Sequence, residues 1–442
     1  MLTPICDFVE MYAKSCGFRF HMPGHKGTGP LGCEALDITE VYGADDLSCP
    51  EGVILESENN AKELFGSRHT FYSTGGSSQC VKAMLHLAYT FRPQGASERI
   101  ISARNAHKSF LHGCALLGLE PVWLFPDDPS PICSCPISPE SLRRELERVD
   151  RPFAVYITSP DYLGGVQDIE ALAELCHSFG VPLLVDNAHG AYLKFLSPSK
   201  HPLDLGADMC CDSAHKTLPV LTGGAYLHVS RSAPAGYEEE ARRSLSVFGS
   251  SSPSYLILQS LDLLNLRIAE GYYERIRETA AKVMELSGEL GLSPSVGDPL
   301  KLAIPAHEFG SSGFELASLL REYRAEPEYA DEDWLVLMFT PELNDGAYSL
   351  IKKALGRRVP GLQQPSILPG PGERLLSPRE ALLSKKELVP VGSCAGRVCA
   401  DVAVSCPPAI PIAICGERIS PEAAKLMEKL GIKYVSVVEG LA

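Results

Sequence analysis

Short apolar segments alternate with amphipathic segments through the middle of the chain. Apolar runs of strand length occur at residues 99–103, 121–125, 153–158, 181–186, 207–211 and 224–229. Helical spacing of apolar residues marks several of the segments between them. Strands that are apolar on both faces and joined by helices favour a mostly parallel sheet covered on both sides. Such sheets bind ligands beyond the carboxyl ends of their strands, so we expect the chemistry of this protein directly after these segments.

Capping residues mark the ends of the predicted helices. Ser138-Pro139-Glu140 combines an N-cap serine, a proline in the first helical turn and an acid near the helix N-terminus. Two further predicted helices, residues 105–118 and 168–180, end at the glycines Gly118 and Gly180, which we interpret as C-caps.

The last third of the chain has a different pattern. After about Ser254 it becomes mainly helical, and a later strand is predicted at residues 334–340. Residues 357–372 are rich in proline and glycine, which is typical of a linker. A capped helix is predicted at residues 419–431, and it runs into the apolar segment 432–438.

Length and composition restrict the class of protein. A chain of 442 residues is long enough for two or three domains, and 45% hydrophobic with 21% charged residues is an ordinary globular balance. A formal net charge of −15 argues against binding to nucleic acid or to an anionic membrane. The N-terminal residues lack the pattern of a signal peptide, and no run reaches about 18 apolar residues. We therefore expect a cytoplasmic enzyme.

The 15 cysteines are scattered and lack the paired spacing of zinc sites. Cys133 with Cys135, and Cys210 with Cys211, are the closest groupings. We interpret them as buried free thiols in a reducing compartment and expect no metal site.

Lys216 lies between a predicted strand and a glycine-bearing strand start, in the segment DSAHKTLPVLTGGAYLHV. A lysine that forms a Schiff base needs a partly desolvated site, so that its amine is neutral often enough to attack. Most lysines are surface charges, and that alternative stays open for this position.

Asp186 ends the predicted strand 181–186 and is followed by Asn187-Ala188-His189-Gly190. A carboxylate at this position can pair with the nitrogen of a pyridine ring and keep it protonated, which makes the ring an electron sink. The alternative is an aspartate that caps a helix.

Three further segments carry candidate binding residues. In YSTGGSSQCVKAML, glycines 75 and 76 and serines 77 and 78 precede a predicted helix, whose N-terminus favours an anion such as a phosphate. No Gly-Lys-Ser/Thr follows, so this is not a Walker sequence. His107 begins a helix after a strand, where an imidazole can stack on a planar ring or serve the fold alone. HMPGHKG at residues 21–27 is either a loop that closes a site or a turn.

The order of these features is more informative than any of them alone. A phosphate-binding turn, a histidine that can face a ring, an acid for a ring nitrogen and a lysine occur in that order. This order, with FHMPGHKG, DITEVYGADDL, RNAHKS, TSPDYLGG, VDNAHGA, SAHKTLP, SSSPSYLILQSLD and GRVCADVAVSCPPAIPIAICGE, resembles the bacterial ornithine/lysine/arginine decarboxylases of the fold-type-I pyridoxal-5′-phosphate (PLP) superfamily. The likeness covers nearly the whole chain and is closest to short Gram-positive-type members without an N-terminal wing domain.

The resemblance implies an α/β fold of the aspartate aminotransferase superfamily. It implies a large domain with a mostly parallel seven-stranded sheet, followed by smaller α/β C-terminal domains. The expected parts are an N-terminal arm, a PLP-binding large domain, a small domain and a decarboxylase-type C-terminal domain, at residues 1–60, 61–255, 256–360 and 361–442. Members of this family form dimers with shared active sites, so the MPGHKG loop and the SSSPSY segment are expected to serve the neighbouring subunit's site.

The resemblance also assigns roles to individual residues. Lys216 is expected to carry PLP as a Schiff base, Asp186 to face the pyridine nitrogen, His107 to stack on the ring and His189 to lie near the 3-hydroxyl group. The residues expected around the phosphate are Gly76, Ser77, Ser78, Ser213 and His215. Lys216 or His215 is expected to return the proton to the substrate, and Asp401 or Glu417 to bind its cationic end.

Several positions depart from the family pattern. Asn187 stands where members commonly have an acid, and Asp401 replaces a glutamate. Cys406, Ala409 and Cys415 replace the usual tyrosine, glycine and proline of the C-terminal motif.

The expected activity is decarboxylation of arginine, lysine or ornithine in polyamine metabolism. Because one fold hosts many reactions, transamination or another lyase reaction stays open. A PLP-binding regulatory homologue with little turnover is the remaining alternative, and the altered C-terminal motif is the reason to keep it.

Overall fold

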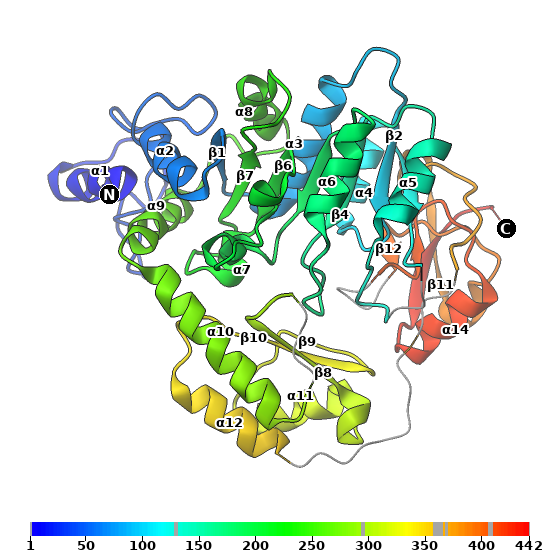
Figure 1. The fold of residues 1–442 in the computed structure, drawn as a ribbon. Coiled ribbons are helices and arrows are strands. Elements are labelled where there is room, and N and C mark those ends of the chain that lie inside the picture. The colour runs from blue at the N-terminus through cyan, green and yellow to red at the C-terminus, as the bar shows by residue number, and fades with distance from the viewer. Residues whose placement is uncertain are drawn as a thin grey trace. The chain divides into compact units, whose positions relative to one another are not determined.

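The computed structural model describes residues 2–127, 131–292, 297–356, 366, 370–404 and 410–441. Seven strands form one sheet in the order β1-β7-β6-β5-β4-β2-β3 (Figure 1). Their bounds are β1 (His69–Ser73), β2 (Arg99–Ala103), β3 (Glu120–Leu124), β4 (Ala154–Thr158), β5 (Leu183–Asp186), β6 (Met209–Asp212) and β7 (Ala225–Val229).

Strand directions confirm the predicted sheet. β2 runs parallel to β3 and β4, and β5 runs parallel to β6. β7 is antiparallel to both of its neighbours, β1 and β6. The sheet is therefore mostly parallel, with β7 reversed. All six strands predicted from apolar runs are present, whereas β1 was not predicted as a strand.

Several helices lie in the first two thirds of the chain, and the predicted capping residues mark the start of one and the end of another. They are α1 (Pro4–Ser15), α2 (Val53–Phe65), α3 (Gly76–Thr90), α4 (Lys108–Leu117), α5 (Pro139–Arg148), α6 (Ile169–Ser178), α7 (Ala214–Thr217), α8 (Tyr237–Val247), α9 (Tyr255–Ala269) and α10 (Tyr272–Glu289), with short 3₁₀ turns η1 (Ala191–Phe195) and η2 (Pro202–Leu205). The Ser138 hydroxyl accepts a hydrogen bond from Ser141 N at 3.1 Å, as expected of an N-cap.

Glycines end two of the predicted helices in different ways. Gly118 is the C-cap of α4 and has the left-handed conformation, φ 74°. The prediction that Gly180 is the C-cap of α6 is wrong by one residue, because Phe179 holds that position and Gly180, with φ 68°, follows it. A glycine directly after the cap relieves the steric strain of a positive φ, which explains its presence there.

The later part of the chain contains three smaller sheets. β8 (Lys301–Pro305), β10 (Trp334–Met338) and β9 (Tyr329–Ala330) form an antiparallel sheet in that order. β11 (Lys386–Pro390) pairs with β14 (Tyr434–Val438), and β12 (Ala403–Val404) pairs with β13 (Ala413–Ile414). The remaining elements are η3 (Ala306–Phe309), α11 (Gly313–Glu322), α12 (Asp345–Leu355), α13 (Pro378–Leu383), η4 (Val391–Ser393) and α14 (Pro421–Lys429).

These elements test the predictions for the last third of the chain. The strand predicted at residues 334–340 is β10, and the helix predicted at 419–431 is α14. The predicted linker 357–372 lies largely outside the described residues. The four-part domain division stays a prediction.

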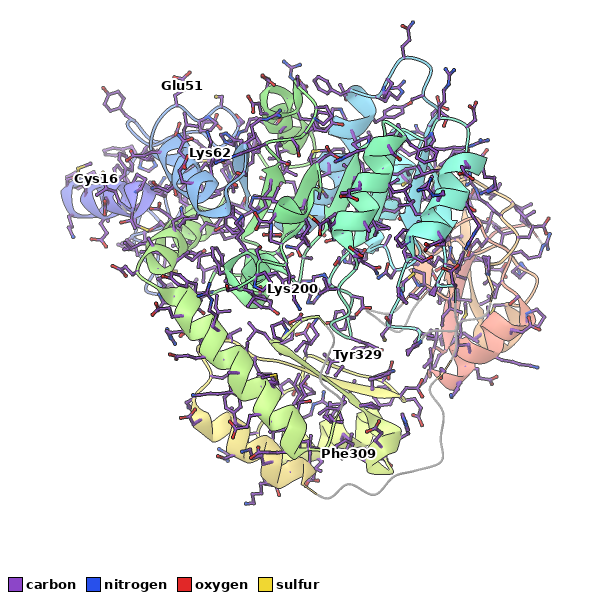
Figure 2. The ribbon with its side chains drawn as sticks, viewed as in Figure 1. Cys16, Glu51, Lys62, Lys200, Phe309 and Tyr329 are labelled. Carbon is purple, nitrogen blue, oxygen red and sulfur yellow. The ribbon has the colours of Figure 1, made fainter. Side chains whose placement is uncertain are left out.

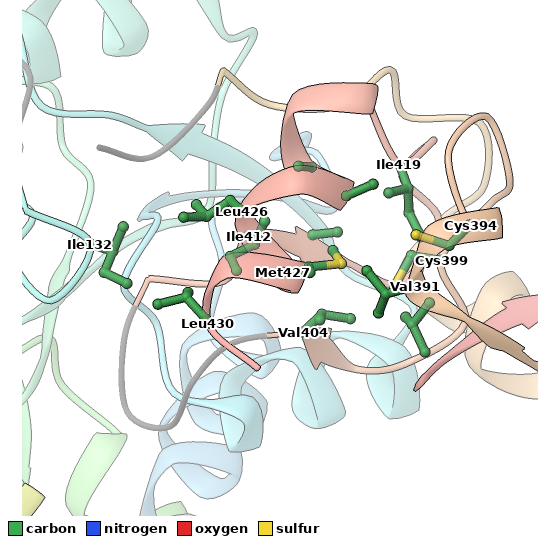
Figure 3. Packing of buried hydrophobic residues seen from close by; sticks show 14 of the residues in the cluster. Ile132, Val391, Cys394, Cys399, Val404, Ile412, Ile419, Leu426, Met427 and Leu430 are labelled. Carbon is green, nitrogen blue, oxygen red and sulfur yellow. The ribbon is translucent and has the colours of Figure 1, made fainter. Parts of the chain in front are cut away.

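The chain divides into two compact units, residues 1–92 with 182–276 and residues 93–181 with 277–442. In the second unit, Phe309 belongs to an apolar cluster that packs helices α10, α11 and α12 on the β8-β10-β9 sheet (Figure 2). A second cluster in the same unit fills the C-terminal segment around Met427, Ile412 and Cys399 (Figure 3). The first cluster covers one face of the β8-β10-β9 sheet. The second contains residues of the β11-β14 and β12-β13 pairs and also Tyr329 and Val336 of the β8-β10-β9 sheet.

Within the described residues, no helix is long and apolar enough to span a bilayer. The described cysteines form no disulfide, and Cys133, Cys135, Cys210 and Cys211 are buried thiols. Burial raises the pKa of the Cys210 and Cys211 thiols well above the ordinary value. Such thiols are protonated and unreactive.

Candidate active site around Lys216

The turn after β5 places Asp186 and His189 at the carboxyl end of the sheet. Asp186 is the last residue of β5 and is 3% exposed. Its Oδ1 accepts hydrogen bonds from Ala188 N at 3.2 Å and from the Cys211 thiol at 3.6 Å. Asp186 is also paired in register with Cys211 of the parallel strand β6. The carboxylate is therefore held on one side by its own turn and on the other by the neighbouring strand.

The short helix α7 follows β6 and carries Lys216 to the same edge. Ser213 is its N-cap, and Lys216 N donates to Ser213 O at 3.0 Å. The Lys216 Nζ lies 3.0 Å from Nε2 of His189, which is three residues after Asp186. Lys216 is half-buried, whereas His189 is 6% exposed. The structure thus joins the lysine of one predicted motif to the histidine of another.

The start of α3 faces the start of α7. Ser213 Oγ donates to Ser77 Oγ at 2.7 Å, which links the two helix N-termini. His215 is held by Gly224, whose carbonyl oxygen lies 3.0 Å from His215 Nδ1 and 3.2 Å from His215 N. These contacts join predicted phosphate-site residues from two separate segments of the first unit.

The groups at this edge fit PLP. Among the described residues, no side chain caps the N-terminal amides of α3, whose N-cap is Gly75. Gly76 has φ 69°, and a Cβ placed there would meet nothing within 4 Å. The backbone can therefore approach an anion closely, and the hydroxyls of Ser77 and Ser78 lie on the first turn. The buried carboxylate of Asp186 suits a protonated pyridine nitrogen, and the amine of Lys216 suits an aldehyde.

A buried polar network supports the turn between Asp186 and His189. Asn187 Nδ2 donates to Asp212 Oδ1 at 2.6 Å. The other oxygen of Asp212 accepts from Nε2 of His201 and of His228, at 3.0 and 3.1 Å. Burial disfavours the carboxylate, but the two imidazoles outweigh burial and hold the pKa of Asp212 below its usual range. Asp212 is therefore a buried anion that anchors the residue after Asp186.

Cys210 completes this cluster, since its thiol and donor atoms of His201 and Asp212 lie within 4.8 Å of one another. His201 Nε2 and Asp212 Oδ2 are already joined by a hydrogen bond. Hydrogen bonding accounts for the arrangement without a metal ion.

His107 belongs to the second unit and caps helix α4. Its Nδ1 accepts a hydrogen bond from Ser109 N at 3.2 Å and lies 2.8 Å from Ser109 Oγ. An Nδ1 that accepts from a backbone N–H carries no proton, so a neutral ring has its proton on Nε2. The histidine is exposed in the single chain.

The two acids predicted for the substrate differ in their surroundings. Asp401 is half-buried, and its Oδ2 accepts from Ser436 N at 2.7 Å. Glu417 is 2% exposed, and both of its carboxylate oxygens accept from Arg104 at 2.7 Å. A substrate-binding role for Glu417 is not favoured by this ion pair, since the carboxylate already has a cationic partner.

Sequence reasoning missed Arg104 and the three residues Asp212, His201 and His228. Arg104 is part of the quoted motif RNAHKS, but a single arginine gives no sign of a partner 313 residues away. Asp212 of β6 and His228 of β7 lie on neighbouring strands, two residues out of direct register. The signal available in the sequence was the alternation of polar with apolar residues in these two strands.

The fold places this site in a known structural class. The crystal structure of the Francisella novicida lysine decarboxylase LdcF matches 99% of this chain and 81% of that one, with a TM-score of 0.80 and 18% sequence identity. The protein therefore has the fold-type-I α/β fold of that decarboxylase.

Sequence comparison identifies the family. The model of the Orn/Lys/Arg decarboxylase major domain matches residues 3–287, and that of the Orn/Lys/Arg decarboxylase C-terminal domain matches residues 373–438. The chain belongs to the Orn/Lys/Arg decarboxylase family. Similar proteins include the uncharacterized protein YaaO of Bacillus subtilis, 30% identical over 97% of this chain and 94% of that protein. The arginine decarboxylase of the same organism is 29% identical over 95% of this chain and 92% of its own length.

Proposed function

We propose that this protein is a cytoplasmic PLP-dependent enzyme that decarboxylates a basic amino acid, arginine, lysine or ornithine, to the corresponding amine in polyamine metabolism. The observation that carries the proposal is the contact between Lys216 Nζ and His189 Nε2 at 3.0 Å, three residues after the buried Asp186. In a member of this family, that arrangement is the one needed to hold PLP by its aldehyde and its ring nitrogen.

Each part of the site has a separate role in holding the cofactor. Lys216 would carry PLP covalently, and Asp186 would keep the pyridine nitrogen protonated. His189 would lie beside the lysine and the ring hydroxyl. The residues that would hold the phosphate are Gly76, Ser77, Ser78, Ser213 and His215. His107 would stack on the ring. PLP would supply an electron sink for the electrons released as CO₂ departs.

The remaining residues act on protons and on the substrate. A proton must return to the substrate's α-carbon after CO₂ leaves, and Lys216 Nζ or the imidazole of His215 would donate it. Asp401 is the better candidate for the cationic end of the substrate, because the hydrogen bond from Ser436 N engages only its Oδ2. Glu417 is less favoured for this role, since Arg104 occupies both of its oxygens.

We propose that the partner is a second copy of this chain. Several large apolar side chains of the N-terminal segment are exposed in the single chain: Phe18, Phe20, Met22, Leu31 and Tyr42, at 56 to 104%. This segment contains HMPGHKG, so a dimer would cover the apolar residues and bring that loop to the neighbouring site. Size-exclusion chromatography with light scattering tests the dimer, and a monomer at micromolar concentration would contradict it.

The function is tested by supplying PLP-loaded protein with arginine, lysine and ornithine in turn and measuring CO₂ and amine. We expect one of the three to yield both products in equal amounts. Accumulation of a keto acid without CO₂ would instead show transamination. If protein that binds PLP converts none of the three, the decarboxylase assignment is wrong. That result is the one expected of a regulatory homologue with little turnover.

A further inference from the structure

A buried ion pair joins the C-terminal domain to the end of strand β2. Arg104, the residue after β2, donates from Nη1 to Glu417 Oε1 and from Nη2 to Glu417 Oε2, both at 2.7 Å. The side chains are only 1% and 3% exposed. Two parallel N–H···O bonds fix orientation as well as distance. The pair therefore sets where residue 104 lies relative to the C-terminal domain, residues 373–438.

Both partners are held firmly by their surroundings. The backbone N of Arg104 donates to Leu124 O at 3.0 Å, and its guanidinium carbon lies 5.1 Å from the centre of the Trp123 ring. Glu417 Oε2 also accepts from Ile414 N at 3.1 Å, and Glu417 O accepts from Cys399 N at 2.8 Å. The backbone bonds hold residues 104 and 417, while the Trp123 ring and the Ile414 N–H contact the two side chains.

Glu417 is the charge partner of Arg104. The Arg104 Nε is buried and has no hydrogen-bond partner within the described part of the chain. A buried cation without its anion is strongly unfavourable, because the low-dielectric surroundings replace water poorly. A substrate cation would have to displace Arg104 from a carboxylate that solvent hardly reaches.

The pair lies close in sequence to a residue of the proposed site. Arg104 precedes His107 by three residues, and the intervening Asn105 accepts from Thr158 Oγ1 through its carbonyl at 3.4 Å. His107 is itself fixed at the start of α4 by the Ser109 N–H. Because only two residues separate Arg104 from His107, we expect a displacement of residue 104 to move the histidine.

We infer that Arg104 and Glu417 are a positioning pair, through which the C-terminal domain holds His107 in place, and that Glu417 does not bind the substrate. The inference rests on the proposed function, because the position of His107 matters for the reaction only if the ring of PLP binds there. It gives the C-terminal domain a role in the geometry of the site that is separate from substrate recognition.

Glu417→Gln tests the inference against a matched control. Glu120→Gln removes the carboxylate of another ion pair between the C-terminal domain and the sheet, Arg374 with Glu120 at 3.0 Å, whose side chains are 35% and 45% exposed. Hydrogen–deuterium exchange of residues 103–112 is measured in the full-length, PLP-loaded protein. We expect faster exchange in Glu417→Gln and wild-type exchange in Glu120→Gln. Wild-type exchange in Glu417→Gln would overturn the inference.

Steady-state kinetics separates positioning from substrate binding. The substrates are the basic amino acid that the wild-type protein converts and its neutral counterpart, which is citrulline for arginine, norvaline for ornithine and norleucine for lysine. We expect kcat of Glu417→Gln to fall by about 10- to 100-fold, as for a misplaced catalytic group. KM and the preference for the basic substrate should stay within about threefold. A loss of that preference with a raised KM would assign Glu417 to the substrate and overturn the inference.

A second variant applies if Glu417→Gln does not fold. Arg104→Met with Glu417→Met removes both charges together, so no buried charge is left alone. We expect this protein to fold, with faster exchange at residues 103–112 and a lower kcat. Wild-type exchange and kcat in the double variant would contradict the positioning role. If the wild-type protein converts no basic amino acid, the proposed function fails, whereas the exchange measurement still decides whether the pair fixes this segment.

Discussion

The region around Lys216 and the region around Glu417 both join residues far apart in sequence, but by different physical means. Lys216 is half-buried, and its amine contacts the imidazole of His189, a group that can exchange a proton. Glu417 is fully buried and bidentate with a permanently charged guanidinium. A group that reacts needs access and a variable protonation state, whereas a group that positions others needs neither. Burial and the charge of the partner therefore distinguish a reactive residue from a positioning residue, which the sequence motifs alone do not.

The largest expected effect is on the reactive side of this comparison. Lys216→Ala removes the amine that would hold PLP, and we expect amine production to fall by at least about a thousandfold. Because the lysine is half-buried and its role is chemical, the free energy of unfolding should change by less than about 1 kcal/mol. Product detection and chemical denaturation measure the two quantities. Lys62→Ala on α2, a lysine of similar exposure, serves as the control and should retain activity.

The buried ion pair should show its effect in stability. Glu417→Gln leaves Arg104 buried without an anion, and we expect the free energy of unfolding to fall by about 3–5 kcal/mol. The exposed pair of Glu120 with Arg374 should contribute less than about 1 kcal/mol, as Glu120→Gln would show. Urea denaturation of the three proteins at pH 7 measures the difference. Equal losses in the two variants would contradict the distinction between the pairs.

A variant of Asp212 tests whether the region around Lys216 also contains residues that position others. Asp212→Asn removes the charge that accepts from His201, His228 and Asn187 but keeps the shape of the side chain. We expect the free energy of unfolding to fall by about 1–3 kcal/mol, since charged hydrogen bonds are weakened. PLP affinity should fall too, because Asn187 anchors the turn of Asp186. Unchanged stability and affinity together would show that the network supports nothing at the site.

The smallest effect concerns Asp262, a buried acid of α9. Asp262 Oδ2 accepts from Ile5 N and Cys6 N, both at 3.0 Å, at the start of α1. Burial raises the pKa of Asp262 to about 6, although its hydrogen bonds oppose the rise. Because the pKa is higher in the folded state than in the unfolded state, the folded protein binds the Asp262 proton more tightly, and protonation stabilises the fold. This stabilisation is complete below the ordinary carboxyl range and is lost as the pH rises through about 6.

Comparison with Asp262→Asn isolates that contribution. The asparagine is neutral at every pH, so its effect does not titrate. The stability of the wild type relative to the variant should be greater at pH 5 than at pH 8 by about 1 kcal/mol. Denaturation at the two pH values measures it, and a difference of the opposite sign would contradict the direction of the pKa shift.

The sequence was sufficient for the parts of the fold that depend on local pattern. Apolar runs predicted the strands around Asp186, and the Ser138 N-cap predicted the start of α5, because burial and capping are read within a few residues. β1 escaped notice, since HTFYS is short, has no long apolar run and owes its burial to pairing with β7. Pairing with a strand that lies more than 150 residues away leaves no local trace.

The same reasoning applies to the candidate site. Lys216, Asp186 and His189 lie in compact motifs, and the structure places them at one edge of the sheet. The partner of Glu417 could not be predicted, because an acid in a motif looks the same whether a substrate or Arg104 neutralises it. Asp212 was equally hidden, since its three donors come from three separate segments. Only the folded contacts separate these roles.

The central claim is that one lysine carries the cofactor. Reduction of the PLP-loaded protein with borohydride makes a lysine–PLP bond permanent, and peptide mass spectrometry then locates the added mass. We predict that the label lies on Lys216 in the wild-type protein and is absent in Lys216→Ala. Label on a different lysine of the wild-type protein, or no label at all, would contradict the account.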